Sequence, residues 1–333
     1  MRTKIATSRQ RQSYVAILLA LLSATLLHRF LSLQLPNVLQ DTVTLTLGIL
    51  YEALPFVFLG VGISIAVQQY VSQDTLLKLL PKRSWLRRPV LSVCGTFLPV
   101  CECGNVPLAR GLMAKGLRPA EVMTFLFAAP TINPVTIYTT TQAFPADPII
   151  VIVRVAAAFI IANAVGSLFA RRSDQSILTS DFQNYCDSHG SAKKESINLH
   201  QRIKNFTSGF SEETLLLMPA LVGGSIIASV IQTALPRNIL QTISGEPVIA
   251  ILALLLLAFV ISICANVDAF FALSLSTVFP TSAIVAFLVF GPMIDIKMLA
   301  LLKTTFKTDV LLYISMFVLI ASFVTGLVVH YAL

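Results

Sequence analysis

The sequence predicts an all-α polytopic membrane protein, built as an inverted repeat with two re-entrant or broken helices and an extra N-terminal transmembrane helix. Three observations lead to this prediction. The 333 residues are 56% hydrophobic and only 12% charged, about half the charged fraction of soluble proteins. Uncharged stretches of about twenty residues recur, enough to cross a hydrocarbon core of ~30 Å. They lack the two-residue alternation of barrel strands, so helices must satisfy the backbone.

Nine apolar blocks define the expected elements in chain order. They fall at about 14–35, 43–69, 89–113, 120–143, 148–170, 212–235, 247–279, 282–303 and 309–332. A polar stretch without apolar period separates the fifth block from the sixth, which is typical of a linker. The expected parts are 1–42, the N-terminal tail and first transmembrane helix; 43–170, membrane repeat 1; 171–209, a cytoplasmic linker; and 210–333, membrane repeat 2.

The two sides of the linker resemble each other at three landmarks. Each landmark recurs in the same order, 161, 162 and 164 residues later. The pairs are Cys103-Gly104-Asn105 with Cys264-Ala265-Asn266, Pro130-Thr131-Ile132-Asn133 with Pro292-Met293-Ile294-Asp295, and Leu54-Pro55 with Met218-Pro219. Coincidence among apolar segments explains such an order poorly, and we therefore predict an internal repeat.

Basic residues set the expected orientation, because Lys and Arg gather in cytoplasmic loops. The N-terminal tail, the loop 71–88 and the linker are basic and are placed inside. An even number of crossings must then separate this loop from the linker, yet three apolar blocks lie between them. We expect block 89–113, which Pro99 and Pro107 interrupt, to be a re-entrant hairpin that turns at Cys101–Asn105.

The second repeat is expected to mirror this hairpin. Block 247–279 enters from outside and turns at Cys264–Asp268, which leaves Lys297, Lys303 and Lys307 inside. Each repeat then has an odd number of crossings, so the halves are inverted, as in transporters with broken helices and a midplane site. Nine full crossings are the alternative, but they place basic loops on the wrong side. The expected location is a bacterial plasma (inner) membrane, crossed several times.

Two cysteines at the first break are the strongest candidates for chemistry. Cys101 and Cys103 flank Glu102, and thiolates are ligands for soft metals and metalloids. The pair could instead form a strained disulfide, exchange thiols, or pack as small residues at a tight turn. The run Cys186–His189 is interpreted as part of a solvated loop. We expect no resident metal, no cofactor and no enzymatic activity.

Four acidic residues are predicted within or beside membrane segments. They are Glu52, Glu102, Asp268 and Asp295. A charge at the bilayer centre costs about 2.5–3.5 kcal/mol even on the mild insertion scale. We interpret these residues as candidates for proton or cation coupling, or for pairing with Arg154. The alternatives are that Glu52 and Asp295 lie near the interface and that Arg154 snorkels.

Three amide side chains lie at or near the predicted breaks. Asn105, Asn133 and Asn266 could line a solute pathway or cap the half-helices. Helix N-termini at such breaks attract negative charge, so either role would serve binding in the middle of the membrane.

The motifs around the first break resemble a known family. The run Pro99-Val100-Cys101-Glu102-Cys103-Gly104-Asn105-Val106-Pro107, followed by Pro130-Thr131-Ile132-Asn133-Pro134, is similar to the DUF318 permease family, which includes ArsP-like organoarsenical efflux permeases. The resemblance extends from about residue 43 to 332. It implies export of a small thiophilic solute such as trivalent organoarsenicals. Three thiols would then meet the arsenic, those of Cys101, Cys103 and Cys264, provided that the hairpin tips meet.

Other classes of function stay open. A membrane thiol-disulfide oxidoreductase using the Cys-Glu-Cys pair is one alternative, and a permease or channel for another small ion is a second. The chain has no ATP-binding P-loop, so active transport would draw on an ion gradient or a partner. The net charge of +8 does not indicate nucleic-acid binding, because the basic residues sit in short loops beside an anionic membrane face. Expected partners are a small-molecule or metalloid substrate, the lipid bilayer and a homo-oligomer.

Overall fold

The computed structural model describes residues 37–81, 83–97, 101–190, 199–234 and 246–332. These residues form helices and no strand, which confirms the predicted all-α polytopic membrane class. Four of the described helices are long and apolar enough to cross a membrane: α2 (Asn37–Tyr70), α8 (Pro148–Phe169), α11 (Leu199–Ala234) and α17 (Thr308–Ala332). The expected first transmembrane helix, at 14–35, lies outside the described residues.

Shorter helices follow α2 and α11 in a similar order. After α2 come α3 (Gln73–Leu79), α4 (Ser84–Cys94), the 3-10 turn η1 (Gly95–Phe97), α5 (Glu102–Ala114), α6 (Pro119–Ala128) and α7 (Pro134–Ala143). After α11 come α13 (Pro247–Ile261), α14 (Asp268–Leu275), α15 (Thr281–Phe290) and α16 (Ile296–Leu302). The starts of α6 and α15, and those of α7 and α16, are each 162 residues apart. This is the spacing of the sequence landmarks.

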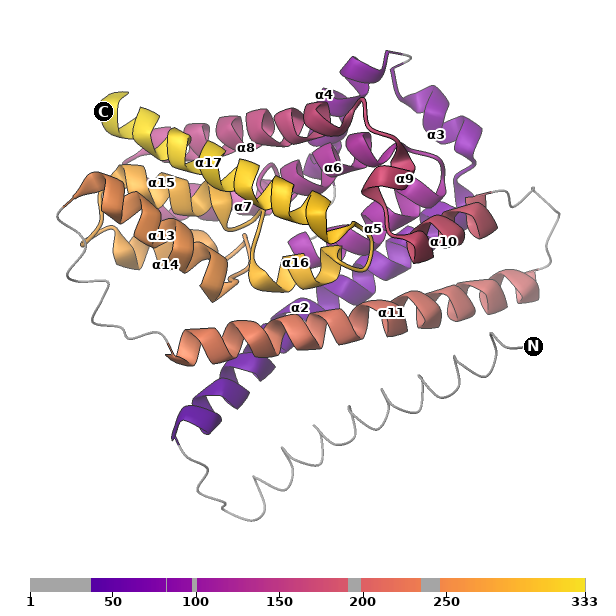
Figure 1. Cartoon of the computed structure of the whole chain (residues 1–333), viewed down its shortest axis with the longest axis horizontal. Coiled ribbons are helices and arrows are strands. Elements are labelled where there is room, and N and C mark those ends of the chain that lie inside the picture. The colour runs from indigo at the N-terminus through magenta and orange to yellow at the C-terminus, as the bar shows by residue number, and fades with distance from the viewer. Residues whose placement is uncertain (1–36, 82, 98–100, 191–198, 235–245, 333) are drawn as a thin grey trace.

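The first broken segment runs from α4 to α5. Helix α4 packs along α6, whereas α5 packs along α2. Gly104, near the start of α5, abuts Gly60 of α2, and Gly116, just beyond α5, abuts Gln73, so α5 and α2 run in the same direction. The start of α4 and the end of α5 therefore lie at the same end of the molecule (Figure 1). This is the arrangement predicted for a re-entrant segment.

The second broken segment runs from α13 to α14. Helix α13 ends at Ser262, whose φ of 53° is left-handed and cannot continue a helix. Helix α14 then packs along α15, where the rings of Phe271 and Phe287 stack with centroids 5.9 Å apart. Only residues 276–280 join α14 to α15, so α14 turns back toward the end from which α13 entered. Figure 1 shows this pair opposite α4 and α5.

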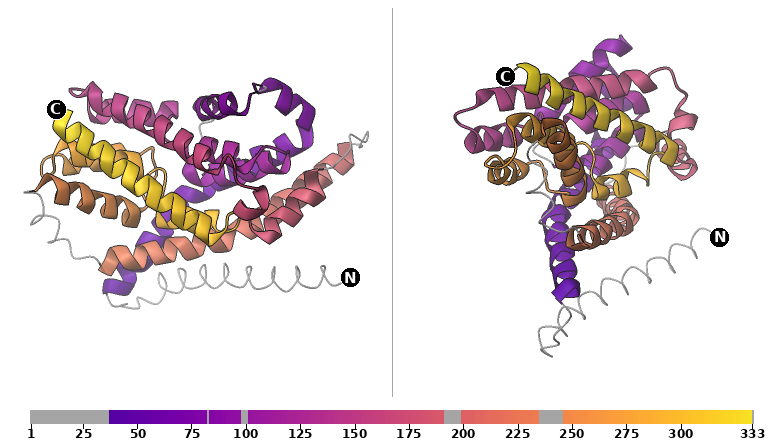
Figure 2. Two further views of the ribbon diagram at one scale, coloured as in Figure 1. Left: turned by 45° about the horizontal axis from the view of Figure 1, so that its top comes forward. Right: turned by 60° about the vertical axis from the view of Figure 1, so that its left-hand side comes forward.

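Two further apolar blocks are each interrupted once. The block at 120–143 contains α6 and α7, and the block at 282–303 contains α15 and α16. Asn133 caps α7 by accepting the N–H of Val135 at 2.8 Å, and Asp295 caps α16 by accepting the N–H of Met298 at 2.6 Å. The two long helices α2 and α11 pack against each other and lie side by side (Figure 2).

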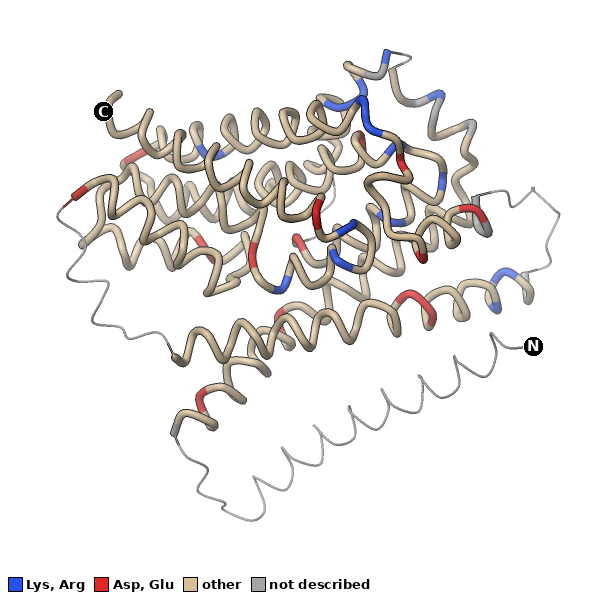
Figure 3. The backbone as a smooth tube through the Cα atoms, viewed as in Figure 1, with Lys and Arg blue, Asp and Glu red and all other residues tan. Residues whose placement is uncertain are grey.

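Positive charge gathers at one end of the molecule, which we call the basic end (Figure 3). This end holds α3, the start of α4, the α5–α6 connection and the residues after α8, whose basic residues are Lys78, Arg83, Arg87, Arg88, Lys115, Arg118, Arg171 and Arg172. At this end Arg88 of α4 donates a hydrogen bond to Ser167 of α8 at 2.8 Å. The loop 71–88 and the start of the linker therefore lie together, whereas the N-terminal tail lies outside the described residues.

The polar segment after α8 is more ordered than the sequence indicated. It contains α9 (Asp174–Ile177) and α10 (Ser180–Gly190), and α11 already begins at Leu199. The backbone of Thr179 donates to Thr305 at 3.0 Å, and Lys307 donates to Ile177 at 3.0 Å, so the segment docks on the α16–α17 connection. Buried Ile177 and Phe182 hold it there. These few apolar side chains are too sparse to give a helical period in the sequence.

Candidate functional site

The tips of the two broken segments meet. Cys101 caps α5 in an extended conformation, so that Glu102 and Cys103 are the first two residues of the helix. Cys264 lies in the turn before α14, and its thiol donates to a carboxylate oxygen of Glu102 at 3.7 Å. The Sγ atoms of Cys101 and Cys264 and an oxygen of Glu102 all lie within 4.8 Å of one another. Three predicted site residues from two halves of the chain are thus in one place.

Cys103 completes this thiol group. Its side chain interacts with that of Cys101, which in turn interacts with Cys264. The three side chains are 3%, 1% and 2% exposed for Cys101, Cys103 and Cys264, and all are free thiols. A solute that reached them would therefore be bound out of contact with bulk water.

Pro107 has a different role from the one predicted. It lies inside α5, which begins at Glu102, rather than at the break. Pro99, the other predicted interruption, lies outside the described residues. Proline has no N–H, so the carbonyl oxygen of Cys103, four residues earlier, has no intrahelical partner. The first turn of α5 thus combines two thiols, a carboxylate, a carbonyl oxygen and the positive end of a helix.

Lys297 lies against the same group of side chains. Its amine donates to the carbonyl oxygen of Ser262 at 2.8 Å and lies 3.1 Å from a carboxylate oxygen of Glu102 and 3.7 Å from one of Asp295. The prediction that Lys297 faces the cytoplasmic side is wrong. It is fully enclosed, because α16 begins at a break in mid-molecule. The position of Lys297 within an apolar block is the sequence signal that could have predicted its burial.

The four predicted acidic residues divide into two groups. Glu102 and Asp295 contact Lys297, and Glu52 of α2 is half-buried beside them, where Cys264 and the charges of Lys297 and Glu102 act on it. Asp268 belongs to the second group. This division places three carboxyl groups around one amine.

The second group centres on Arg154 of α8. Its guanidinium lies 2.6 Å from a carboxylate oxygen of Asp268 and donates to Thr140 at 2.7 Å. The side-chain oxygen of Asn266 accepts the hydroxyl of Thr136 at 3.1 Å in the same region. Arg154 therefore pairs with a predicted acid, as one expectation had it, and does not snorkel.

The three predicted asparagines have separate surroundings. Asn133 caps α7, and Asn266 is bonded to α7 through Thr136. Asn105 is completely buried in α5, and within the described part of the chain neither atom of its amide has a hydrogen-bond partner. Buried amides are normally satisfied, so a water molecule or a solute is the expected partner here.

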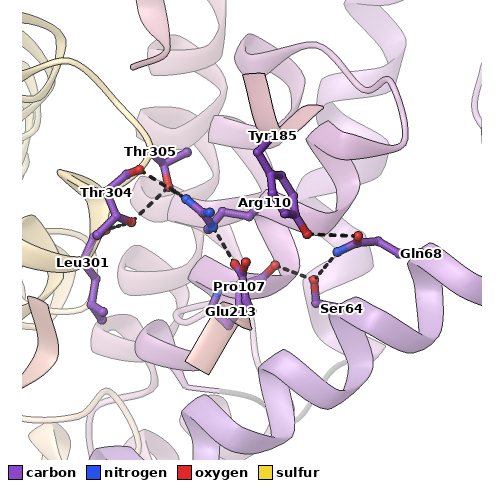
Figure 4. A network of polar contacts seen from close by, with 9 residues as sticks. All are labelled: Ser64, Gln68, Pro107, Arg110, Tyr185, Glu213, Leu301, Thr304 and Thr305. Atoms are coloured by element: carbon purple, nitrogen blue, oxygen red, sulfur yellow. Dashed lines mark hydrogen bonds and ion pairs between the residues drawn. The ribbon is translucent and has the colours of Figure 1, made fainter. Parts of the chain in front are cut away.

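Sequence reasoning missed a polar network that centres on Arg110 (Figure 4). Arg110 of α5 forms an ion pair with Glu213 of α11 and donates to the hydroxyl of Thr305 at 2.9 Å. Its guanidinium also lies 4.4 Å from the ring centroid of Phe182 in α10. Tyr185 extends the network to α2, where its hydroxyl donates to Gln68 at 3.3 Å. One side chain therefore joins both halves of the chain and the linker.

Burial also governs the ionisable groups of α10. It raises the pKa of Tyr185 to about 12 and that of Cys186 to about 11. Cys186 is half-buried in a helix, and so it does not lie in the solvated loop that the sequence indicated. Its thiol is almost entirely protonated at neutral pH and hence a poor nucleophile.

Comparison with known proteins gives one family and two similar chains. The family ArsP_1, described as "Predicted permease", matches residues 38–331. A Streptococcus mutans protein named as a subunit of a two-component membrane permease complex is 34% identical over 278 residues, which cover 84% of this chain and 91% of that protein. The Bacillus subtilis UPF0718 protein YcgR is 31% identical over 262 residues, covering 78% of this chain and 87% of that protein. No solved structure gives a significant match.

Proposed function

We propose that this chain, which belongs to the ArsP_1 family of predicted permeases, is a secondary transporter that exports a small thiophilic solute such as a trivalent organoarsenical. Family membership accounts for a multi-pass membrane permease. One observation carries the finer proposal: thiols from two broken segments converge on a carboxylate at a buried helix end. Soft thiol ligands in such a place suit a soft solute.

The helix order supports an inverted repeat as the transport framework. Corresponding helices recur 162 residues apart, and the two broken segments enter from opposite ends and meet at their tips. In transporters of this plan the two halves rock about a fixed central site. We propose 43–170 and 210–333 as the two repeats, joined by the linker 171–209. The basic end then faces the cytoplasm.

Thiol chemistry defines the proposed binding step. A monosubstituted trivalent arsenical carries two hydroxyl groups, and each is replaced by a thiol with release of one water molecule. Two As–S bonds form, two As–O bonds break, and the thiol protons leave in the water. Cys101 and Cys264 are close enough to act together, and Cys103 is the neighbouring thiol that could exchange with either. Asn105 is proposed to form a hydrogen bond with a hydroxyl group of the incoming solute before a thiol replaces that group.

Uptake into everted membrane vesicles tests the substrate and the site together. Wild type should accumulate trivalent methylarsenite, and Cys101→Ser should reduce the rate at least tenfold because a hydroxyl is a poor ligand for arsenic. Cys186→Ser is the matched control and should transport like wild type, since Cys186 lies in the linker. Equal transport by wild type and Cys101→Ser would refute the thiol site. No transport by wild type would exclude arsenic and leave the permease fold standing.

Burial weighs against the alternative of a thiol-disulfide oxidoreductase. The thiols of Cys101, Cys103 and Cys264 are enclosed, so the thiol of a partner protein has no approach to them in this conformation. A trapped mixed disulfide with Cys101 in a Cys103→Ser variant would nevertheless establish that alternative. Saturable, gradient-dependent uptake would exclude a simple channel.

The similarity to a permease complex subunit bears on partners. The Streptococcus mutans relative is named as part of a two-component complex. We propose that this chain likewise works with a second membrane subunit. Gentle detergent extraction followed by mass determination distinguishes a hetero-complex from the homo-oligomer that the sequence also allowed.

A further inference from the structure

Lys297 is a buried amine held where three broken helices meet. It is the second residue of α16, and Asp295 caps that helix. Its amine touches the carbonyl oxygen of Ser262 at the end of α13 and the carboxylate of Glu102 at the start of α5. The sequence predictions gave this residue no role at the site.

The atoms around the amine are those that usually surround a metal cation. Two carboxylates and the carbonyl of an unwound helix end face it, at 3.1, 3.7 and 2.8 Å. Cation-coupled transporters bind their ion with carbonyl groups of unwound segments and helix C-terminal ends, and hard cations prefer oxygen ligands. The carbonyl oxygen of Ser262 accepts a hydrogen bond from the ammonium group, and the two carboxylates face it as ion pairs.

The charges around Lys297 do not balance. Among the residues that the structure describes, the titratable groups that face it are Glu102 and Cys103 of α5, Asp295 of α16, Cys264 before α14, and Glu52 of α2 beside Cys264. Glu102 and Asp295 alone would leave one net negative charge after pairing with Lys297. An uncompensated buried charge is expensive, so the cluster is expected to hold one more positive charge. A proton on a carboxyl group supplies this charge without further ligands, whereas the oxygen atoms that a metal ion would need already face Lys297.

We propose that Lys297 is a built-in cation, which fills the place of a metal ion and makes the proton the coupling ion of this permease. The inference rests on the proposed transporter function. On one side of the membrane the protonated carboxyl of Asp295 gives its proton to water. The carboxylate formed is then held by Lys297. On the other side water returns a proton to the same oxygen, and the O–H bond re-forms.

Thermal unfolding of the purified protein tests the built-in cation without any transport measurement. The protein is unfolded in NaCl, LiCl, KCl or choline chloride at constant ionic strength. Wild type should show the same Tm in all four salts. In Lys297→Met the carboxylates lose their counter-ion, so Tm should rise with NaCl or LiCl concentration and saturate. Lys303→Met is the control: this lysine is exposed at the end of α16, and its removal should create no cation response.

Two results would overturn the proposal. A specific rise in the Tm of wild type with one metal cation would show that the site already binds that ion. A folded Lys297→Met protein whose Tm is insensitive to all three metal salts would show that the amine does not fill a cation site. The proposal also predicts that Tm of the double variant Glu102→Gln/Lys297→Met does not rise with NaCl or LiCl, because the carboxylate that faces the ion is gone.

If Lys297→Met does not fold, the pH dependence of Tm in wild type tests the proposal instead. A buried carboxyl that holds a proton stabilises the folded state at lower pH, and this stabilisation is lost as pH rises. Tm of wild type should therefore fall with rising pH, and Asp295→Asn should flatten this dependence. An unchanged dependence in Asp295→Asn would refute the exchangeable proton. Failure of the methylarsenite assay would leave these results unaffected.

Discussion

Arg154 and Asp268 form an ion pair in which both side chains are almost completely enclosed, at 1% and 3% exposure. Such a pair connects α8, in the first half, to the start of α14 in the second. The attraction between buried charges roughly offsets the cost of removing them from water, so the pair itself adds little stability. Removing only one of the two charges is costly, because the remaining buried charge then has no partner.

Breaking this pair on one side should therefore cost far more than replacing it. Within the described part of the chain, Asp268→Ala leaves Arg154 with the hydroxyl of Thr140 and the carbonyl of Ala265. It should lower the free energy of unfolding by about 3–5 kcal/mol. The double variant Arg154→Met/Asp268→Leu should recover most of this loss. Unfolding curves of the three proteins in one detergent give the comparison. Equal losses in the single and double variants would contradict the argument.

At the scale of helices, the contact between α2 and α5 depends on glycine. A Cβ atom at Gly60 would lie 2.1 Å from the carbonyl oxygen of Gly104, which no local adjustment accommodates. Gly62, two residues further along the same helix, has nothing within 4 Å of its Cβ position. The close approach matters for function because α5 carries the Cys-Glu-Cys turn.

These two glycines give a matched pair of substitutions. Gly60→Ala should displace α5 from α2, and with it the thiols of Cys101 and Cys103, so that solute binding and thermal stability both fall. Gly62→Ala should leave binding unchanged and raise stability by up to about 1 kcal/mol through helix propensity. Binding to the detergent-solubilised proteins and their Tm values are the measurements. A Gly60→Ala protein that is as stable as Gly62→Ala would contradict the predicted collision.

The network around Arg110 acts at the same scale. It joins α5 to α11 and to Thr305 beyond α16, and Phe182 of α10 covers it. A movement that opens the basic end must separate Arg110 from Glu213. The proposed rocking of the two halves thus has an identified set of contacts to break.

Across the whole molecule, the broken segments and the pairing of Arg154 with an acidic residue could be predicted from the sequence, whereas the contacts of Lys297 and Arg110 could not. Proline placement and the parity of basic loops sufficed for the hairpins, since both are local features of the chain. The meeting of Glu102 with Lys297, 195 positions later, depends on how two hairpins pack together. The register of α16 likewise decides that Lys297 is buried while Lys303 is exposed. Neither follows from the composition of an apolar block.

Orientation in the membrane is the remaining property of the whole molecule, and it can be tested by thiol labelling. Lys115, between α5 and α6, lies at the basic end, whereas Ala146, between α7 and α8, lies at the opposite end (Figure 1). In a Cys186→Ser background, Lys115→Cys should react only with a membrane-permeant maleimide added to intact cells. Ala146→Cys should also react with an impermeant one. Gly116 is unsuitable for this purpose, because its φ of 88° and the nearby Gln73 leave no room for a side chain.

The outcome separates the two topologies that the sequence allowed. Nine full crossings would make the block 89–113 a crossing, which places Lys115 outside and Ala146 inside. A re-entrant segment leaves Lys115 inside and Ala146 outside. Labelling of Lys115→Cys but not of Ala146→Cys by the impermeant maleimide would therefore contradict the re-entrant arrangement. Labelling of both from outside would contradict the single broken crossing formed by α6 and α7. The inverted repeat, the central thiol site and the coupling role of Lys297 all require labelling of Ala146→Cys alone, because each needs two hairpins that enter from opposite faces and meet.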